Sequence, residues 1–453
     1  MASGPKAHVA VLTFPFSSHP SALFFLTRKL AEWVPDVAFS FFCIAKTNTY
    51  LSSWPTIPNL RIYDVADGVE EGHVLEVSLE DQLELFLRAT PWNYREAIQR
   101  VDEIDKVSYV LSDAFLWFAG LMAEEMGVPW VAFWNGSACS LSAHVNTDLI
   151  RQMIGTRPEE VSARQDESLA FIPGCSQFRV RDLPEGIVVG QLDLPLFTSL
   201  HRMSQELPRA AAVLVNSIEE VDPTPLLDRL RTFFNKLLLV GPLSLLAPTR
   251  PDSESDPHSC LAWLGSQAPA SVAYVGFGTI FVPPPSELAA LAEGLEGSGA
   301  HFLWSLKEKH RESLPAGFLE RTRGRGLVVS WTPQPIVLGH VAVGAFINHC
   351  GYNSVLESIM GGVPIICRPL FGDQRINARV LSHVLGVAVD VKDEVLTKEG
   401  VMDALDLLLH RKEGKIMREK TVSLQQVVKN AIRETGSATN NMKAVLEIIK
   451  GST

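Results

Sequence analysis

Polar side chains that could hold a phosphorylated sugar collect in one stretch, residues 331–374. There an apolar segment ends at His349 and Gly351, and a helical pattern follows. The start of a helix offers free backbone N–H groups and a partial positive charge, which attract phosphate. Glycine lets a ligand approach the backbone closely, and Asn353 and Ser354 add donors beside the histidine. This part of the stretch therefore predicts a phosphate-binding site.

The same stretch carries groups suited to the other parts of a nucleotide sugar. Trp331 offers a flat apolar face on which a nucleobase can stack. Glu357 shares the helix face of Ser354, and its carboxylate can accept hydrogen bonds from two ribose hydroxyls. Asp373 and Gln374 follow a second short strand and supply acceptors and donors that suit a sugar.

Each feature taken alone has a simpler explanation. Ser354 and Glu357 have the spacing of a capping box, and Asp373 can cap the helix that follows it. Trp331 can be a core residue, and His349 a buried histidine whose hydrogen bonds are satisfied. In this order and spacing, the features together favour a ligand site.

A second candidate for chemistry combines His19 with Asp113, which lie far apart in the sequence. Each follows a predicted strand, and ligands collect at the carboxyl ends of such strands. A carboxylate partner orients a histidine and stabilises its protonated form, which makes the histidine a general base. The alternatives are a loop histidine beside Pro20 and a helix N-cap at Asp113. The residues alone leave these readings open.

The elements that must position these residues alternate between strand and helix. β-Branched and apolar runs predict strands, longer amphipathic stretches predict helices, and their alternation is typical of a parallel, doubly wound α/β sheet. In the first half, strands are predicted at 8–14, 37–44, 60–65, 107–111, 130–134, 211–215 and 237–240. Helices are predicted at 22–34, 80–101 and 115–126, and loops with short helices over 155–208.

The alternation restarts after a polar, proline-broken segment, 247–259, which predicts an interdomain linker. Strands are predicted at 272–277, 301–306, 327–329, 342–347, 364–367 and 387–391, and helices at 398–409, 415–433 and 437–449. A chain of 453 residues is longer than a single domain with one hydrophobic core usually is. We therefore predict two Rossmann-like domains that face a cleft, residues 1–246 and 260–436, followed by a last helical segment over 437–453.

Residues 331–374 resemble the 44-residue donor-binding signature of plant UDP-sugar-dependent glycosyltransferases. The resemblance extends over essentially the whole chain. Within the family, this chain is similar to the flavonoid 3-O-glucosyltransferase branch. The resemblance is carried by Phe14-Pro15-Phe16-Ser17-Ser18-His19, Asp64-Val65-Ala66-Asp67-Gly68-Val69, Phe171-Ile172-Pro173-Gly174, Phe277-Gly278-Thr279, Pro283-Pro284-Pro285, Ile366-Cys367-Arg368-Pro369 and Gly372-Asp373-Gln374-Arg375. It implies the GT-B fold, in which the last helix crosses back onto the first domain.

The resemblance also implies roles for single residues. His19 would be the general base and Asp113 its orienting partner. The donor-binding residues that it implies are Ser17, Asn135, Thr279, Trp331, Thr332, Gln334, His349, Gly351, Tyr352, Asn353, Ser354, Glu357, Asp373 and Gln374. The acceptor-binding residues that it implies are Phe14, Ser18, Phe115, Trp117, His144, Phe197 and Phe371. Several aromatic rings with one polar group suit a flat phenolic compound.

The implied reaction is an inverting transfer of glucose from UDP-glucose to a hydroxyl of a flavonol or anthocyanidin, at the 3-position, in plant secondary metabolism. The alternatives are another sugar (galactose or rhamnose), another phenolic acceptor, or C-glycosylation. The resemblance implies no cofactor and no metal. The chain departs from the signature at Tyr352, where tryptophan is usual. We expect an active enzyme with relaxed donor or acceptor selectivity.

The composition restricts the partners and the compartment. A net charge of −11 argues against a nucleic-acid surface. The six cysteines are scattered without a C-x-x-C pair, which favours reduced thiols in the cytoplasm over a disulfide frame or a zinc site. No segment predicts a membrane span or a signal peptide. We expect a cytoplasmic monomer that binds only small molecules.

Two other classes of protein remain as rivals. An NAD(P)-dependent oxidoreductase would need a G-x-G-x-x-G motif after the first strand, and Pro15-Phe16-Ser17-Ser18 contains no glycine. A non-catalytic protein that binds sugar nucleotides would not need both His19 and Asp113. Hydrolysis of UDP-sugars with and without a phenolic acceptor separates the three classes.

Overall fold

The structure is a computed structural model that describes residues 7–69, 79–247, 256–278 and 282–451. The chain forms two compact units. Unit 1 comprises Met1–Ser176, Glu185–Pro248 and Ala431–Thr453, and unit 2 comprises Gln177–Pro184 and Thr249–Asn430. Most of the expected linker, 247–259, lies outside the described residues, so the linker and the exact domain limits stay predictions.

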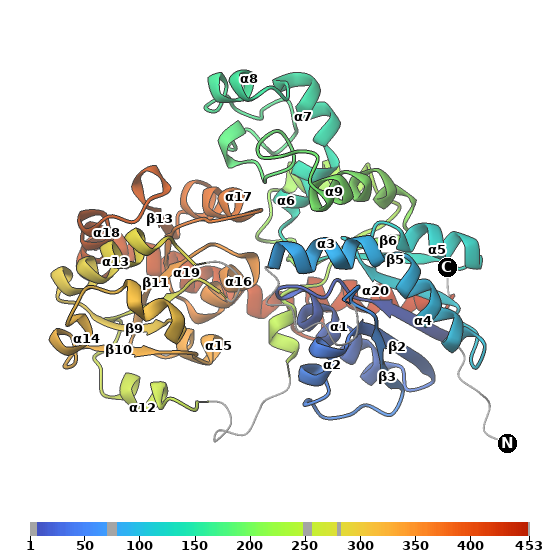
Figure 1. Ribbon diagram of the computed structural model, residues 1–453, viewed down its shortest axis with the longest axis horizontal. Coiled ribbons are helices and arrows are strands. Elements are labelled where there is room, and N and C mark those ends of the chain that lie inside the picture. Colours follow the sequence, from blue (N-terminus) through green and yellow to red (C-terminus); the bar gives the residue numbers. More distant parts are fainter. Residues whose placement is uncertain (1–6, 70–78, 248–255, 279–281, 452–453) are drawn as a thin grey trace. The chain divides into compact units, whose positions relative to one another are not determined.

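Unit 1 is built on a seven-stranded sheet in which every pairing is parallel. Its order is β3-β2-β1-β4-β5-β6-β7, so the strand order reverses between β1 and β4. The strands are β1 (Ala7–Leu12), β2 (Val37–Ile44), β3 (Leu60–Val65), β4 (Tyr109–Asp113), β5 (Trp130–Trp134), β6 (Ala212–Val215) and β7 (Leu237–Leu239). Figure 1 shows strands and helices alternating along the blue-to-green part of the chain.

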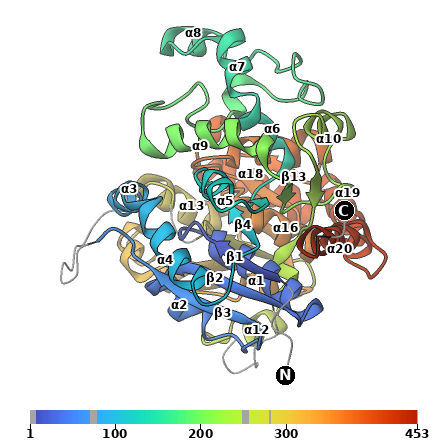
Figure 2. The same cartoon turned by 90° about the vertical axis from the view of Figure 1, so that its right-hand side faces the viewer.

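The helices of unit 1 connect and cover these strands. They are α1 (His19–Trp33), α2 (Ala45–Leu51), α3 (Leu79–Ala89), α4 (Trp92–Asp102), α5 (Ala119–Met126), α6 (Ala138–Val145), α7 (Thr147–Ile154), α8 (Pro158–Ala163), α9 (Pro195–Glu206), α10 (Thr224–Arg231) and α20 (Ser437–Ile449), with short 3₁₀ turns at Leu207–Arg209 and Leu243–Leu246. Of these, α7 and α8 lie far from the sheet, beyond α6 and α9 (Figures 1 and 2).

Two predictions for this unit need correction. The single helix expected over 80–101 is two helices, α3 and α4, because Pro91 has no N–H to donate and the second helix starts after it. The region 155–208, expected to hold only loops and short helices, contains the 12-residue helix α9. Pro195 begins that helix, which is a favoured position for proline.

Unit 2 has a six-stranded parallel sheet in the order β10-β9-β8-β11-β12-β13. The strands are β8 (Val272–Gly276), β9 (His301–Ser305), β10 (Gly326–Val329), β11 (Val343–Asn348), β12 (Ile365–Cys367) and β13 (Ala388–Asp390). The helices are α12 (Cys260–Gly265), α13 (Pro285–Ser298), α14 (Phe318–Arg321), α15 (Gln334–Leu338), α16 (Tyr352–Gly361), α17 (Gln374–Arg379), α18 (Lys398–His410) and α19 (Lys412–Ala431). Shorter turns are Val180–Asp182, Glu308–Ser313, Val380–Leu385 (a π-helix) and Lys392–Glu394. The predicted doubly wound sheets are thus confirmed in both units.

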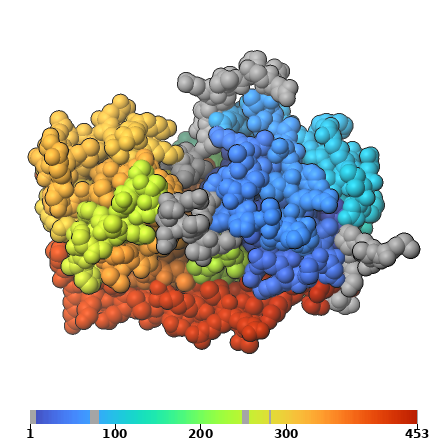
Figure 3. Space-filling model, turned by 90° about the horizontal axis from the view of Figure 1, so that it is seen from below, coloured from blue at the N-terminus to red at the C-terminus, as the bar shows by residue number. Residues whose placement is uncertain are grey.

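The last helix, α20, belongs to unit 1 although the long unit 2 segment Thr249–Asn430 precedes it in the chain. Its buried side chains, Met442, Val445 and Ile449 among them, join the core of β1, β2 and α1. At the right of the space-filling view in Figure 3, red C-terminal residues lie directly against blue N-terminal ones. The prediction that the C-terminal helix crosses back to the first domain is confirmed.

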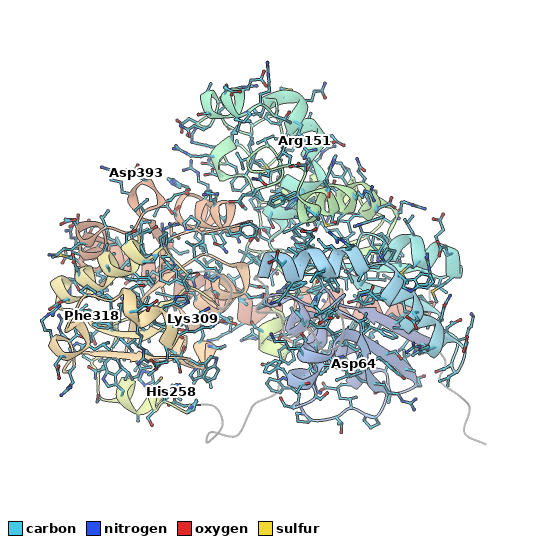
Figure 4. All side chains as sticks on the ribbon, viewed as in Figure 1. Asp64, Arg151, His258, Lys309, Phe318 and Asp393 are labelled. Carbon is cyan, nitrogen blue, oxygen red and sulfur yellow. The ribbon has the colours of Figure 1, made fainter. Side chains whose placement is uncertain are left out.

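Each unit has its own apolar core. In unit 2 the stacked rings of Phe302 and Phe318 are 5.8 Å apart, and Trp304 meets Phe318 edge-on; Phe318 is labelled in Figure 4. Full burial of such a side chain stabilises the fold by about 1.5–3 kcal/mol. All six cysteines are buried and free of disulfides. Among the described residues, no helix has the length and apolarity to cross a membrane.

Candidate active site

In unit 1, the reversal of strand order brings the ends of β1 and β4 side by side. The chain leaves these two strands in opposite directions, which opens a crevice where ligands collect. His19 begins α1 shortly after β1, and Asp113 is the last residue of β4. The topology therefore joins two residues that are 94 positions apart.

The His19 ring is hydrogen-bonded to the Asp113 carboxylate, with 2.7 Å between Nδ1 and Oδ2. The Asp113 side chain is fully buried, whereas that of His19 is 12% exposed. A carboxylate accepts here, so Nδ1 carries the proton and Nε2 presents its lone pair. This arrangement has the geometry of an oriented general base.

The simpler explanations of these two residues also describe real contacts. The second carboxylate oxygen of Asp113, Oδ1, accepts the Phe115 N–H at 3.0 Å, so Asp113 does organise the turn that follows it. His19 does stand beside Pro20 at the start of a helix. The turn contact fixes the carboxylate at both oxygens, which holds the histidine ring more firmly in place.

Two aromatic rings lie against the His19 ring. Phe115 lies 4.6 Å from the histidine ring and Phe14 lies 5.3 Å from it, centroid to centroid. Trp134 continues this row at 5.7 Å from Phe115 and ends against His144 at 5.4 Å. Burial lowers the pKa of His144 to about 4, so its ring is neutral at physiological pH. The structure thus places two of the predicted acceptor residues, Phe14 and Phe115, against the base, and a third, His144, at the far end of the same row of rings.

Trp134 was not predicted as a site residue. It is the last residue of β5, directly before Asn135, and it links Phe115 to His144. Its position at the carboxyl end of a central strand was the signal that could have identified it.

A row of polar side chains crosses the same edge of the sheet. Asn135 donates from Nδ2 to the Ser18 hydroxyl at 3.4 Å and accepts at Oδ1 from Asn216, 3.0 Å away. Asn216 follows β6 and accepts the Leu243 N–H, so its side chain is fixed. Ser17 has a φ of 58°, which is uncommon for a residue other than glycine, in the loop before α1. Asn216 was not predicted.

Two predicted acceptor residues have other neighbours. Trp117 packs under Arg202, whose guanidinium carbon lies 4.9 Å from the ring centroid. Phe197 is buried on α9 directly over Gly186, where an added Cβ would lie 2.4 Å from the ring. Arg151 of α7, labelled in Figure 4, donates to the Gly186 carbonyl at 3.0 Å and so ties this loop to α7.

In unit 2 the strand order reverses between β8 and β11, and the predicted phosphate site lies at the ends of these strands. Gly278 follows β8 and His349 follows β11. An added Cβ at Gly278 would lie 3.0 Å from the His349 ring, and one at Gly351 would lie 2.4 Å from Nε2. Only glycine allows this close approach at both positions. Thr279, a predicted phosphate contact, lies outside the described residues.

Burial lowers the pKa of His349 to about 4, so the ring is neutral at physiological pH. Its neighbour α16 begins at the buried Tyr352, and the N-cap residue Gly351 has no side chain that could cap the helix. Asn353 and Ser354 follow in the first turn. This is the arrangement in which a helix N-terminus binds phosphate.

Gln334 organises the helix face beyond that turn. Its Nε2 donates to the Ser354 hydroxyl at 2.9 Å and to Glu357 Oε2 at 2.8 Å, and its Oε1 accepts from Tyr274 at 3.1 Å. Tyr274 is also hydrogen-bonded to Thr332, with 2.7 Å between the hydroxyls. Ser354 lies inside α16, whose N-cap is Gly351, so Ser354 and Glu357 do not form a capping box. Tyr274 is a supporting residue that was not predicted.

Trp331 is 49% exposed, so it is not a core residue, and its face is accessible to a stacking base. Asp373 occupies the N-cap position of α17, but its side chain makes no capping hydrogen bond. The simpler explanations for these two residues are therefore wrong.

Gln374 is buried, and its side-chain oxygen accepts two backbone N–H groups, from Leu370 at 2.7 Å and Phe371 at 2.9 Å. Both lone pairs of Oε1 are thereby used, and the amide nitrogen is the part that can serve a ligand. A side chain that both donates to and accepts from a sugar does not fit this arrangement. Phe371, a predicted acceptor residue, belongs to unit 2 and supports this loop through its backbone.

Comparison with known proteins agrees with these features. A family model described as "UDP-glucoronosyl and UDP-glucosyl transferase" matches residues 59–431. A flavonol 3-O-glucosyltransferase from Arabidopsis thaliana is 46% identical over 449 residues, which cover 98% of this chain and 97% of the relative. An anthocyanidin 3-O-galactosyltransferase from Actinidia chinensis var. chinensis is 45% identical over 453 residues, 99% of this chain and 98% of the relative.

A solved structure resembles the whole chain as well. The crystal structure of a UDP-glucose: anthocyanidin 3-O-glucosyltransferase in complex with UDP superposes with a TM-score of 0.92 at 40% identity, and the match covers 100% of both chains. A likeness of this extent includes both sheets and the C-terminal helix.

Proposed function

Since this chain belongs to the UDP-glucoronosyl and UDP-glucosyl transferase family and is a UDP-glycosyltransferase of the GT-B fold, we propose that it transfers glucose from UDP-glucose to the 3-hydroxyl of a flavonol or anthocyanidin. The similar relatives that act on flavonols and anthocyanidins at this position support the acceptor class. The observation that carries the proposal is the hydrogen bond between His19 and the buried Asp113, framed by aromatic rings.

In the proposed reaction, His19 Nε2 removes the proton of the acceptor hydroxyl. The oxygen attacks the anomeric carbon from the face opposite UDP, the bond to the diphosphate breaks, and a β-glucoside forms. Asp113 stabilises the imidazolium that results. The flat rings of Phe14 and Phe115 suit a planar phenolic acceptor.

The leaving diphosphate gains charge that must be stabilised. We assign this task to the N-terminus of α16 together with His349, Asn353 and Ser354. These are neutral donors and a helix dipole, so the proposal includes no metal. Addition of a chelator should therefore leave turnover unchanged, and a loss restored by a divalent cation would contradict this part of the mechanism.

The experiment that tests the function is a matrix of donors and acceptors. Purified enzyme is incubated with UDP-glucose, UDP-galactose or UDP-rhamnose and with flavonols, anthocyanidins and unrelated phenols, and the product linkage is determined by NMR. The proposal predicts 3-O-β-glucosides as the main products. A main product with a C–C linkage, or hydrolysis of the donor without transfer, would refute it.

Gln374 should decide the choice of donor sugar. The relatives named above use different sugars at nearly equal identity, so overall similarity does not identify the donor. The fixed amide of Gln374 donates to one sugar hydroxyl, whereas a histidine could not accept both N–H groups from Leu370 and Phe371 in the same way. We expect wild-type enzyme to prefer UDP-glucose and Gln374→His to lose that preference, by about tenfold in the ratio of kcat/KM values.

Competition between UDP-glucose and UDP-galactose in one reaction measures that ratio directly. Gln426→His is a suitable control, because Gln426 bonds only Asn430 on the surface of α19 among the described contacts. A clear preference of the wild-type enzyme for galactose would overturn the assignment of the donor.

Donor binding should depend on pH through Glu357. Burial raises its pKa to about 7, and the hydrogen bond from Gln334 offsets this only in part. Ribose hydroxyls bind the ionised carboxylate more strongly than the protonated one. The affinity for UDP-glucose should therefore be full above pH 7 and fall below it, by up to about tenfold per pH unit.

Calorimetry with UDP-glucose between pH 5.5 and 8.5, a range that we choose to bracket this pKa, tests the prediction, since the diphosphate diester does not titrate there. Glu357→Gln keeps a neutral acceptor and should give weaker, pH-independent binding. An affinity of the wild-type enzyme that does not change across pH 7 would argue against the ribose contact.

A further inference from the structure

We propose that Asn348 is a positioning residue that holds the His349 ring with its Nε2–H directed at the diphosphate of the donor. The inference rests on the proposed function, because it concerns how that site binds its charged ligand. Asn348 is not among the predicted site residues. Its side chain acts on the ligand only through the neighbouring His349.

Asn348 is the last residue of β11 and is fully buried. Its Nδ2 donates to the Gly276 carbonyl at 2.7 Å and to His349 Nδ1 at 3.1 Å, while its Oδ1 accepts the Cys350 N–H at 2.7 Å. The carbonyl and the N–H allow only one orientation of the amide, because the opposite one would set oxygen against oxygen and N–H against N–H. The amide group is therefore fixed by the backbone of β8 and of the loop that follows β11.

The fixed amide determines the tautomer of His349. An amide nitrogen can only donate, so Nδ1 must accept and cannot carry the proton. The ring is neutral, as its lowered pKa indicates, and its one proton therefore sits on Nε2. A ring with the opposite tautomer would present a lone pair, which repels phosphate oxygens.

Two glycines lie close to the Cε1–Nε2 edge of the same ring. Added Cβ atoms at Gly278 and Gly351 would lie within 3.0 Å of it, and the one at Gly351 would lie 2.4 Å from Nε2 itself. Nε2 therefore lies beside Gly351, the N-cap of α16, and so next to the helix N-terminus that we assign to the diphosphate. Asn348 thus aligns a side-chain donor with backbone donors at the point where β8 and β11 diverge.

A purely structural role is the competing explanation. Asn348 also holds Cys350, whose φ of 63° is strained for a residue with a side chain. In that case its removal would loosen the loop as a whole, and the damage would not depend on the histidine ring. The two roles make opposite predictions in a double-mutant cycle.

The cycle measures UDP affinity by calorimetry for wild type, Asn348→Ala, His349→Ala and the double variant. His349→Ala should weaken UDP binding by about 10- to 100-fold, as expected for a hydrogen bond to a charged group. Asn348→Ala should weaken it about fivefold or more while His349 is present, and by less than about twofold when His349 is already alanine. Equal losses in the two backgrounds would overturn the inference.

Asn377→Ala is the matched control. Asn377 donates to the Cys350 carbonyl at 3.1 Å and so supports the same loop without touching the ring in any described contact. Its effect should be the same with and without His349. An effect of Asn377→Ala that also vanishes without His349 would mean that loop disorder alone produces the coupling, and the inference would fail.

A measurement on the unmodified enzyme keeps the proposal testable if Asn348→Ala does not fold. With ¹⁵N-labelled histidine, the His349 signals (assigned by their loss in His349→Ala) should show a protonated Nε2 and an unprotonated Nδ1 at neutral pH. A protonated Nδ1 would refute the inference while leaving the proposed function intact. Absence of UDP binding by the wild-type enzyme would instead refute the proposed function.

Discussion

Replacing His19 with alanine is expected to lower turnover by a factor of about a hundred or more, because the acceptor hydroxyl then has no base to take its proton. The affinity for UDP should change little, since His19 lies in unit 1, and the phosphate-binding groups assigned above lie in unit 2. Steady-state kinetics together with UDP calorimetry separate these effects. Near-normal turnover in His19→Ala would exclude the proposed mechanism.

Asp113→Asn provides the companion variant, because it keeps the size of the side chain. Its oxygen can still accept the Phe115 N–H, which places the amide nitrogen against the His19 ring. An amide nitrogen donates, so Nδ1 would have to accept and Nε2 would carry the proton, which is the wrong tautomer for a base. The rate should fall strongly with little loss of stability, and adding His19→Ala should cost little more, since the two residues act as a unit.

The meeting of His19 and Asp113 shows what sequence patterns can predict about this site. Each predicted strand of both sheets is present, because β-branched runs between turn residues mark buried parallel strands well. The rule that ligands collect beyond the carboxyl ends of such strands then suffices to pair residues 94 positions apart.

The supporting residues were not predictable by the same means. Tyr274, Asn216 and Asn348 sit at strand ends or inside strands, where their polar groups carry no periodic signal. Each matters through a partner on another strand, and single-sequence patterns do not reveal which side chains face one another. The break between α3 and α4 was overlooked for a different reason: the apolar pattern continues across Pro91 although the helix cannot.

Arg368→Met is expected to lower the free energy of unfolding of unit 2 by about 3–5 kcal/mol. Arg368 follows β12 and grips Glu287 of α13 with two hydrogen bonds, Nε to Oε2 at 2.7 Å and Nη2 to Oε1 at 2.6 Å. The side chains are only 11% and 8% exposed. Without Arg368 the Glu287 carboxylate is left buried and unbalanced. Urea unfolding followed by tryptophan fluorescence, with Trp304 buried in this unit, measures the loss.

The pKa of Glu287 gives the same contact a pH dependence. Burial alone would raise that pKa, but the hydrogen bonds from Arg368 and from the Leu396 N–H outweigh burial and hold it below its ordinary value. A carboxylate with a lowered pKa stabilises the fold above the pKa of the unfolded chain and loses that contribution as the pH falls. The difference between wild type and Arg368→Met should therefore shrink toward acidic pH.

Two further variants decide whether the buried charge is the cause. Arg323→Met breaks the pair with Glu320, whose side chains are 78% and 75% exposed, and should cost no more than about 1 kcal/mol. Adding Glu287→Gln to Arg368→Met removes the unbalanced charge but keeps an oxygen for the Leu396 N–H, so it should restore most of the stability. If the double variant is instead as unstable as Arg368→Met, the uncompensated charge is not the cause of the instability. The loop between β12 and α17 then depends on the packing of the arginine stem, which both variants lack.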